Sequence, residues 1–267
     1  MVERPEAMHE PAGNEVIRSG SNALVKRIHL VRAGKEPGML VLEGERLIED
    51  ALASGVPIEV LLVAAEDEQR ARELEARGLT VARAAPAAMN RASGLVTPPG
   101  IVALARAPAP APLGRPGPRA LVLVVSGVAD PGNLGALARS AEAAGADALV
   151  CVAGGASPWN EKALRGSMGS LLRLPVHGFA DAQAARDALA RQGYRQVSAQ
   201  TRGGLPPERV DWNGPIALWI GPETGAGSGA GSSTAVTIPM AGRAESLNVT
   251  VAAALLLFAA GRAVPRP

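Results

Sequence analysis

The sequence predicts an α/β protein built from two units, and three observations lead to that prediction. Short apolar runs rich in β-branched residues alternate with amphipathic segments along the chain, as expected where strands alternate with helices. A proline- and glycine-rich segment, residues 107–119, interrupts this alternation. The 267 residues are enough to bury a core on each side of it. We therefore expect a smaller α/β unit over residues 16–106, a semi-stiff linker over 107–119 and a larger α/β unit over 120–267.

The first unit opens with an expected helix. Leu24, Ile28 and Val31 form an apolar stripe at helical spacing, Asn22 precedes the stripe and Gly34 ends it. The alternation that follows predicts a strand at 39–42, a helix at 45–53, a strand at 58–63, a helix at 67–77, a strand at 79–82, a short helix at 87–95 and a strand at 100–105.

The second unit begins with the nearly continuous β-branched run 120–128, which is typical of a strand buried on both faces of a parallel sheet. Helical and strand patterns then alternate again. We expect further strands at 148–152, 174–177, 196–199, 216–220 and 235–238, and a final helix over about 247–262.

Composition excludes several classes of protein. No uninterrupted apolar stretch reaches the ~18 residues that a membrane span needs. Residues 1–15 hold no apolar block, so we expect a disordered N-terminus, no secretory signal and a cytoplasmic protein. The one cysteine, Cys151, lies in an apolar run, so we expect its thiol to pack as a small hydrophobic group. We expect no disulfide and no metal site. Aromatic residues make up only 2% of the chain, so a stacking platform for bases is poorly supported.

The net charge of +2 conceals a local basic block between positions 16 and 35, which contains no acidic residue. Charge alone is compatible with either a solvated helix face or a surface that meets phosphate groups. The block consists of Arg18, Lys26, Arg27, Arg32 and Lys35.

Three segments lie at the ends of expected strands, where open α/β sheets place their ligands. In the first, Asp130–Gly145, a Pro-Gly turn joins a strand to a helix. Asn133 is placed to cap that helix, and Arg139 could project toward a charged partner. On these residues alone, a simple cap and a solvated arginine remain the alternative.

The second segment, Leu218–Gly227, leads a buried strand into a glycine-rich turn that permits close backbone approach. It matches neither a Walker P-loop nor a Gly-x-Gly-x-x-Gly fingerprint, so ATP and NAD are poorly supported. In the third, Ile238–Thr250, Ser246 or Asn248 opens an apolar helix whose first backbone amides can bind anions.

Together the three segments resemble the motifs of the SpoU (TrmH-like) RNA methyltransferases of the SPOUT superfamily. Asp130-Pro-Gly-Asn-Leu-Gly with Arg139 and Gly145 resembles the first motif, Ile220-Gly-Pro-Glu223 the second, and Ile238-Pro-Met with Ser246-Leu-Asn-Val249 the third. Residues 165–176 resemble the stretch between the first two motifs. Residues 16–106 are more weakly similar to a ribosomal-protein-like RNA-binding domain, most clearly at Glu43-Gly-Glu-Arg-Leu-Ile48.

The resemblance implies a parallel sheet whose C-terminal segment forms a trefoil knot, a rare exception to unknotted topology. It also implies an S-adenosyl-L-methionine-dependent methyltransferase that acts on a ribose 2′-hydroxyl of RNA, with ribosomal RNA favoured. A transfer RNA ribose methyltransferase, or a non-catalytic RNA-binding protein on the same fold, remains the alternative. An oxidoreductase on a doubly wound sheet is disfavoured, because the phosphate fingerprint is missing.

The family's functional positions map onto this sequence by resemblance. They imply a homodimer in which Arg139 approaches the donor pocket from the partner chain and, being protonated, positions phosphate and hydroxyl. The implied catalytic residues are Asn133, Arg139, Glu223, Ser246 and Asn248. The implied methyl-donor residues are Gly221, Ile238, Met240 and Leu247. The implied RNA-binding residues are Arg18, Lys26, Arg27, Arg32, Lys35 and Arg165.

Overall fold

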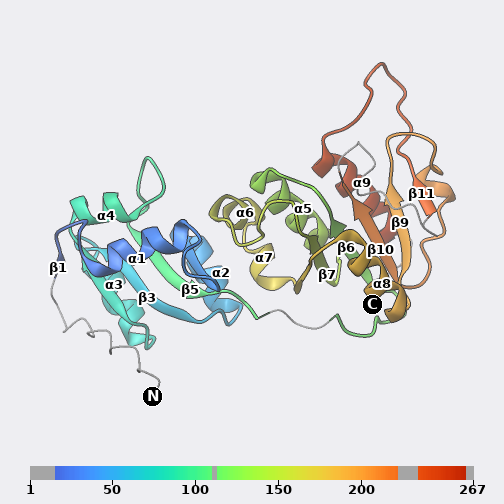
Figure 1. Cartoon of the computed structure of the whole chain (residues 1–267). Helices are drawn as coiled ribbons and strands as arrows, with labels where there is room; N and C mark the ends of the chain where they lie inside the picture. The colour runs from blue at the N-terminus through green and yellow to red at the C-terminus, as the bar shows by residue number, and fades with distance from the viewer. Residues whose placement is uncertain (1–15, 110–112, 222–233, 263–267) are drawn as a thin grey trace. The chain divides into compact units, whose positions relative to one another are not determined.

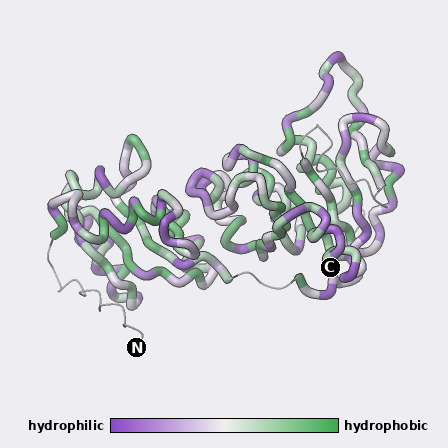
Figure 2. Tube along the Cα trace, viewed as in Figure 1, coloured by the Kyte–Doolittle hydropathy of each residue, from purple (hydrophilic) through white to green (hydrophobic). Residues whose placement is uncertain are grey.

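The computed structural model describes residues 16–109, 113–221 and 234–262. The chain divides into two compact units, Met1–Ala107 and Pro108–Pro267 (Figure 1). Hydrophobic segments run through the interior of each unit (Figure 2). The disorder expected for residues 1–15 lies outside the described residues.

The described strands of the first unit form a mixed sheet in the order β1-β4-β3-β5-β2. The strands β1, β4 and β3 are parallel, whereas β5 is antiparallel to both β3 and β2. The strands are β1 (Val16–Ile17), β2 (Met39–Glu43), β3 (Ile58–Ala64), β4 (Val81–Ala84) and β5 (Ile101–Arg106). The helices are α1 (Ala23–Arg32), α2 (Glu45–Ala53), α3 (Glu68–Ala76) and α4 (Pro86–Ala92).

Two differences from the expected elements have simple causes. The strand expected at 79–82 begins two residues later, at Val81, because Gly78 with φ 81° and Leu79 first turn the chain out of α3. The strand β1 was not expected, because its two residues are too short to show an alternating pattern. The expected helix after Asn22 is confirmed, and the Asn22 side chain caps it by accepting from Leu24 N.

Helices cover both faces of this sheet. The helices α1 and α4 pack onto a core that includes Val41, Leu62, Ala82 and Val102. Because side chains alternate between the two faces of a strand, Arg83 points to the opposite face from Ala82. There its guanidinium group pairs with Glu68 and Glu75 of α3. The face beneath α3 is therefore held by charge as well as by apolar contact.

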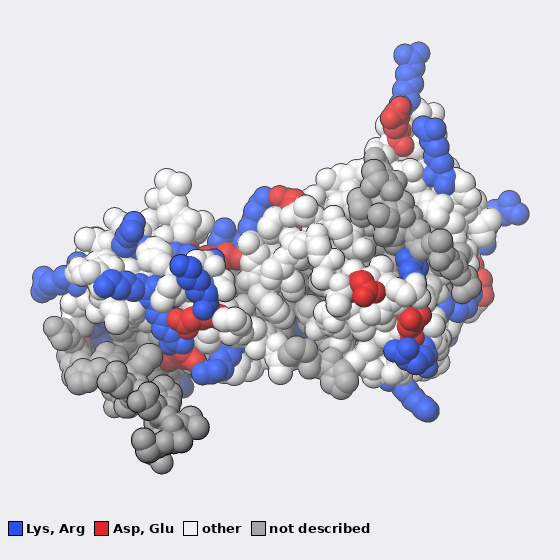
Figure 3. All heavy atoms as spheres, in the orientation of Figure 1, with Lys and Arg blue, Asp and Glu red and all other residues white. Residues whose placement is uncertain are grey.

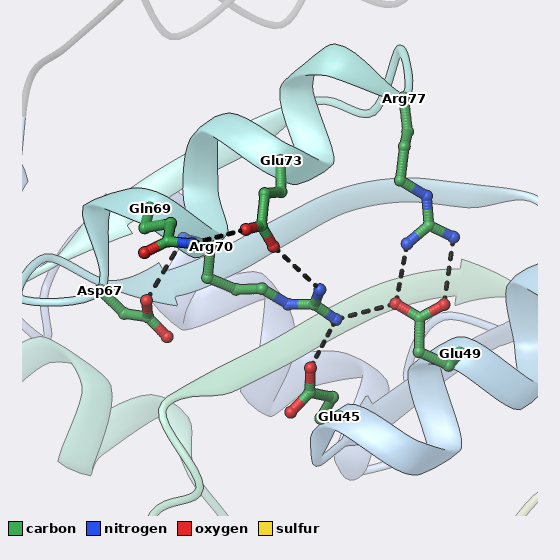
Figure 4. Close-up of polar contacts among 7 residues, drawn as sticks. All are labelled: Glu45, Glu49, Asp67, Gln69, Arg70, Glu73 and Arg77. Carbon is green, nitrogen blue, oxygen red and sulfur yellow. Dashed lines mark hydrogen bonds and ion pairs between the residues drawn. The ribbon is translucent and has the colours of Figure 1, made fainter.

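A network of ion pairs ties α2 to α3 (Figure 4). Arg70 of α3 pairs with Glu45 and Glu49 of α2 at 2.8 Å in each case. Arg77, just after α3, reaches the same Glu49 carboxylate at 2.8 Å, and these arginines hold the pKa of Glu49 below its ordinary value. Arg70 and Arg77 are thus held in ion pairs within the protein.

Acid should weaken the contacts between α3 and the sheet. Hydrogen bonds from Arg83 and Arg72 lower the pKa of Glu68 from 4.5 to about 2. A carboxyl with a depressed pKa stabilises the fold above its unfolded value and loses that contribution as pH falls through the folded value. We expect amide protection in α3 to decrease between pH 4.5 and 2, and the decrease to be shallower in Arg83→Gln. Hydrogen exchange is the suitable measurement, and equal pH slopes for the two proteins would refute this prediction.

The described strands of the second unit form an all-parallel sheet in the order β11-β9-β10-β6-β7-β8, which confirms the expected parallel sheet. The strands are β6 (Leu121–Val125), β7 (Ala148–Val152), β8 (Val176–Phe179), β9 (Arg195–Ala199), β10 (Ile216–Ile220) and β11 (Thr234–Val236). The helices are α5 (Pro131–Ala144), α6 (Glu161–Ser167), α7 (Ser170–Arg173), α8 (Ala182–Gln192), the 3-10 turn η1 (Pro207–Arg209) and α9 (Val249–Arg262).

The sheet of the second unit is buried between helices. Ala185 and Leu189 of α8 pack against Val122, Val150 and Trp219 on one face. On the other face, α5 and α9 contact each other and the central strand β6. Burial raises the pKa of the Cys151 thiol in β7 to about 12, in keeping with a small hydrophobic residue. No helix within the described ranges is long and apolar enough to cross a membrane.

Candidate active site

A cavity of about 540 Å³ opens at the carboxyl ends of β6, β9, β10 and β11. Parallel strands bring their carboxyl ends to one edge of the sheet, so the segments after these strands meet there although they are far apart in sequence. The cavity is lined by Gly127, Val128, Ala129, Asp130, Asn133, Ala199, Gln200, Thr201, Arg202, Trp219, Ile220, Gly221, Val236, Ile238, Met240, Glu245, Ser246, Leu247, Val249, Ala252 and Leu256.

The first motif forms the wall of the cavity at the start of α5. The expected cap by Asn133 is wrong, because Asp130 is the capping residue and its side chain accepts a hydrogen bond from Asn133 N at 2.9 Å. Pro131 takes the first helical position, where its missing N–H costs nothing. The Lys162 ammonium group lies 2.7 Å from Asp130, and this contact holds the pKa of the Asp130 carboxyl below its ordinary value. The Asp130 carboxylate and the Lys162 ammonium group therefore form an ion pair at the wall of the cavity.

The structure separates the two predicted catalytic residues of α5. Asn133 lines the cavity, whereas Arg139 does not. Arg139 is exposed, and no hydrogen bond or ion pair involves it among the described residues. At 1.5 Å per residue it lies about 9 Å further along the helix axis than Asn133. Within one chain, Arg139 is therefore outside the pocket that contains Asn133.

Two glycines of the first motif, Gly135 and Gly145, are required by the local structure. A Cβ atom at Gly135 would lie 2.4 Å from the Ala163 carbonyl oxygen, so α5 and α6 approach closely only because that side chain is absent. Gly145 ends α5 in the left-handed conformation with φ 79°. The motif thus encodes packing as well as chemistry.

The third motif lines the opposite wall. Asn248 caps α9, because its Oδ1 accepts from Thr250 N at 2.8 Å and from the Thr250 hydroxyl at 2.5 Å. Ser246 and the half-buried side chains of Ile238 and Leu247 line the cavity, and so does Met240. The hydrogen bonds of Asn248 make it a helix cap, and it is not among the lining residues.

The second motif is described only in part. Gly221 follows β10 directly and lines the cavity. Glu223, predicted as a catalytic residue, lies outside the described residues.

Sequence reasoning missed the segment after β9. Gln200, Thr201 and Arg202 line the cavity beside the first and third motifs. The available signals were their place at the carboxyl end of the strand expected at 196–199 and the Gly203-Gly204 and Pro206-Pro207 pairs that follow them. Glu245 of the third segment was also missed, and it adds a second acidic side chain to the lining. In the part of the chain that the structure describes, no cluster of three or more His, Cys, Asp or Glu residues could hold a metal ion.

The predicted RNA-binding residues fall into two groups. Arg27 pairs with Glu36 at 2.9 Å and Glu59 at 2.8 Å, and Arg32 pairs with Glu43 at 2.9 Å. Arg165 lies 3.7 Å from Glu161. By contrast, Arg18, Lys26 and Lys35 are exposed, and none of them has an ion pair to another described residue. Several Lys and Arg side chains stand out from the visible face of the first unit (Figure 3).

Comparisons with known proteins agree over both units. A family model described as the SpoU rRNA Methylase family matches residues 120–258, and one described as an MRM3-like substrate binding domain matches residues 22–103. The 23S rRNA (guanosine(2553)-2′-O)-methyltransferase RlmP of Bacillus subtilis (strain 168) is 32% identical over 249 residues, which cover 91% of this chain and 97% of that protein. The 23S rRNA (uridine(2479)-2′-O)-methyltransferase of Streptomyces viridochromogenes is 32% identical over 239 residues, covering 84% and 83%.

Solved structures give the same result. The AdoMet-bound rRNA methyltransferase from Sinorhizobium meliloti has a TM-score of 0.81 at 27% identity and covers 94% of this chain and 99% of its own. The SpoU methyltransferase AviRb from Streptomyces viridochromogenes, in complex with AdoMet, has a TM-score of 0.79 at 30% identity and covers 91% and 98%.

The parallel sheet and the cavity at its carboxyl edge, together with these likenesses, define an S-adenosylmethionine-dependent RNA 2′-O-ribose methyltransferase of the SPOUT class. The chain belongs to the SpoU rRNA methylase family. The family, the activity class and the methyl donor expected from the motifs are thereby confirmed.

Proposed function

We propose that this chain methylates a ribose 2′-hydroxyl of ribosomal RNA. The observation that carries the proposal is the meeting of Asn133, Gly221 and Ser246, one from each motif, at one cavity. The relatives named for 23S rRNA align over both units, which favours ribosomal over transfer RNA as the substrate.

The cavity suits the methyl donor. Its volume lies within the range of small-molecule sites, about 300–1,000 Å³, and it combines apolar walls with the acidic groups of Asp130 and Glu245. The lining also includes Arg202, so apolar, acidic and basic side chains together fit a ligand that carries an aromatic base, positive groups and a carboxylate. Gly221, Ile238, Met240 and Leu247 would hold S-adenosylmethionine, which supplies an electrophilic methyl group on its sulfonium. Gly221 allows close backbone approach, and Ile238 and Leu247 supply the apolar contact.

Arg139 would act from the partner chain of a homodimer. Its guanidinium group lies outside the pocket of its own chain, as described above. An exposed apolar stripe on α9, formed by Val251, Leu255 and Phe258, supports association, because these residues follow helical spacing and are 47%, 51% and 42% exposed. In the dimer, the guanidinium would bind phosphate and orient the ribose hydroxyl toward the methyl group, since it stays protonated and makes a poor base.

The remaining predicted catalytic residues would shape the site and position its groups. Asn133 and Ser246 line the cavity and can hydrogen-bond the reacting hydroxyl or its neighbours. Asn248 would act through the start of α9, which it caps and which lies beside Ser246 and Leu247. Glu223 remains part of the proposal on its motif alone.

The first unit would bind the RNA through exposed cations. Arg18, Lys26 and Lys35 are the candidates, because Arg27 and Arg32 are already paired with carboxylates. Arg165 of the second unit is half-buried and has only a 3.7 Å contact to Glu161, so it stays a candidate.

The trefoil knot also belongs to the proposal, and the parallel pairing of two segments supports it. The connection after β9 lies directly against β11, where Leu205 N donates to Ala235 O and Thr237 N donates to Leu205 O, both at 2.9 Å. Gly204 N donates to the Thr237 hydroxyl at 2.9 Å. The chain then continues from this parallel bridge through Ile238 into the lining of the cavity.

Gly204 should tolerate no side chain beside this parallel bridge. A Cβ there would lie 2.7 Å from the carbonyl carbon of Val236 and 2.8 Å from that of Ala235, both backbone atoms. We expect Gly204→Ala to lower the free energy of unfolding by about 2 kcal/mol and to weaken donor binding, because Val236 and Ile238 would have to move. Chemical denaturation and calorimetry measure the two effects. Gly242→Ala, which meets no atom within 4 Å, is the control, and equal effects of the two substitutions would count against the close backbone approach at Gly204 as the cause.

The experiment that tests the function uses purified protein, labelled S-adenosylmethionine, and either deproteinised ribosomal RNA, ribosomal particles or transfer RNA from a strain lacking the gene. Label on a ribose 2′-oxygen of ribosomal RNA, free or in particles, is the expected result. Label on transfer RNA alone would select the alternative substrate. Transfer to none of the three would reject the proposal.

A further inference from the structure

The first unit contains a buried carboxylate that the proposed reaction does not use. Glu43 ends β2 and opens the Glu43–Ile48 segment singled out in the sequence, and its side chain is fully buried, 0% exposed. Burying a carboxylate is costly unless charge and hydrogen bonds compensate it. Glu43 receives both, from Arg32 at 2.9 Å, from the backbone N–H of Gly94 at 3.0 Å and from the Ser93 hydroxyl.

These bonds pin one end of the loop between α4 and β5. Ser93 and Gly94 are its first residues, and Arg32 also donates to the carbonyl of Ala92, the last residue of α4. The Arg32 guanidinium packs so closely on Gly94 that a Cβ there would lie 3.1 Å from its central carbon. Three hydrogen bonds to the buried Glu43 carboxylate, from Arg32, Ser93 and Gly94, thus fix the beginning of the loop.

The other end of the loop is pinned as well. Gly100, with φ 78°, accepts a hydrogen bond from Ala64 N at 2.8 Å, and Gly44 N donates to Ile101 O. Between the two ends stands the tip, Leu95–Pro99, in which Pro98 and Pro99 restrict the backbone further. The loop projects beyond α4 (Figure 1), and Val96 in its tip is fully exposed.

We propose that this tip is an RNA-contacting element, which packs Val96 against an unstacked nucleotide of the substrate RNA. The inference rests on the proposed function and extends it to the way the substrate is recognised. Sequence-specific RNA recognition mostly targets unstacked bases, whose faces pack against protein side chains. Residues 16–107 contain no Phe, Trp or Tyr, and the fully exposed Val96 is an apolar side chain that can cover such a face.

Charge around the tip favours RNA over a protein partner. The tip itself carries no charged residue. Arg32, which anchors the loop, lies in α1, and exposed Lys26 and Lys35 lie in and just after the same helix. Exposed Arg91 lies in the last turn of α4, and its side chain packs against Gly20 in the segment that follows Arg18. Phosphates on either side of a contacted base would therefore meet cations on the α1 and α4 side of the unit.

The test compares full-length variants for binding to deproteinised ribosomal RNA by filter binding at several salt concentrations. Val96→Ser removes the apolar face on a fully exposed side chain, so folding should be unaffected. We expect about tenfold weaker binding with an unchanged salt slope, because no phosphate contact is lost. Val96→Leu should bind like the wild-type protein. Lys26→Ala, the matched contrast, should reduce the salt slope by about one phosphate contact.

A second readout locates the contact directly. A Val96→Cys protein carrying a benzophenone label should crosslink to the RNA, and the native Cys151 should stay unlabelled because burial raises its pKa to about 12. If the wild-type protein binds and methylates ribosomal RNA but Val96→Ser behaves identically, the inference is wrong while the proposed function stands. If Val96→Ser loses activity only on ribosomal particles, the partner is a protein and the RNA contact is wrong. Wild-type protein that neither binds nor methylates any ribosomal RNA would overturn the proposed function itself.

Discussion

Arg139→Ala is expected to lower kcat for methyl transfer by at least about 100-fold while leaving donor affinity near that of the wild-type protein. The expectation follows from position, since Arg139 lies outside the donor cavity and would act only on the RNA. Single-turnover methylation and calorimetric donor binding separate the two effects. Arg139→Lys is the control for the guanidinium group, and near-normal turnover in that variant would argue against a specific guanidinium role.

Subunit complementation shows which chain supplies the arginine. Ser246→Trp should fill the cavity and block donor binding. This variant keeps Arg139 but lacks the donor, whereas Arg139→Ala keeps the donor cavity but lacks the guanidinium group. If Arg139 acts across the interface, a dimer of one Arg139→Ala and one Ser246→Trp chain carries one complete site. Random co-assembly should then restore about a quarter of wild-type activity. Two inactive variants that stay inactive together would place Arg139 in its own chain's site.

Gly135→Val is expected to cost the second unit at least about 3 kcal/mol of its free energy of unfolding. The Ala163 carbonyl oxygen would lie 2.4 Å and Ser167 N 2.8 Å from the new Cβ, and both are backbone atoms that cannot rotate away. The helices α5 and α6 must separate, which also displaces Asn133 from the cavity. Tryptophan fluorescence during urea unfolding reports on this unit alone, because Trp159, Trp212 and Trp219 all lie within it.

Gly178→Ala is the matched control in the same unit. Gly178 lies in β8, its backbone conformation is open to any residue, and a Cβ there meets no atom within 4 Å. Its unfolding midpoint should stay within experimental error of the wild-type value or rise slightly. A similar loss of stability in both variants would show that the close approach of α5 and α6 is not the cause.

The order of elements was predictable because it rests on local signals. Apolar periodicity gave α2 and β7 with the observed boundaries, and the all-parallel arrangement followed from buried β-branched runs such as β6. The misjudged details were those for which neighbouring residues carry no signal. The two residues of β1 form a strand only because β4 pairs with them.

The candidate site shows the same division. The three motifs and their place at the ends of strands were readable from the chain, and all four predicted donor residues line one cavity. Gln200–Arg202 went unnoticed, because only the pairing of β9 with β10 and β11 brings them to the same edge. The cap of α5 was assigned to Asn133 where Asp130 performs it, since both residue types cap helices and only geometry distinguishes them.

The sequence by itself determined the family, the methyl donor and the class of reaction, because these are written in contiguous motifs whose residue types the chemistry requires. Tertiary structure decided which charges remain available for RNA. Arg27 and Arg32 look equivalent to Lys26 and Lys35 along the chain, yet carboxylates from distant strands pair with the first two and leave the others exposed. The physical reason is that an ion pair depends on distance in space, and distance in space is set by how the strands and helices pack.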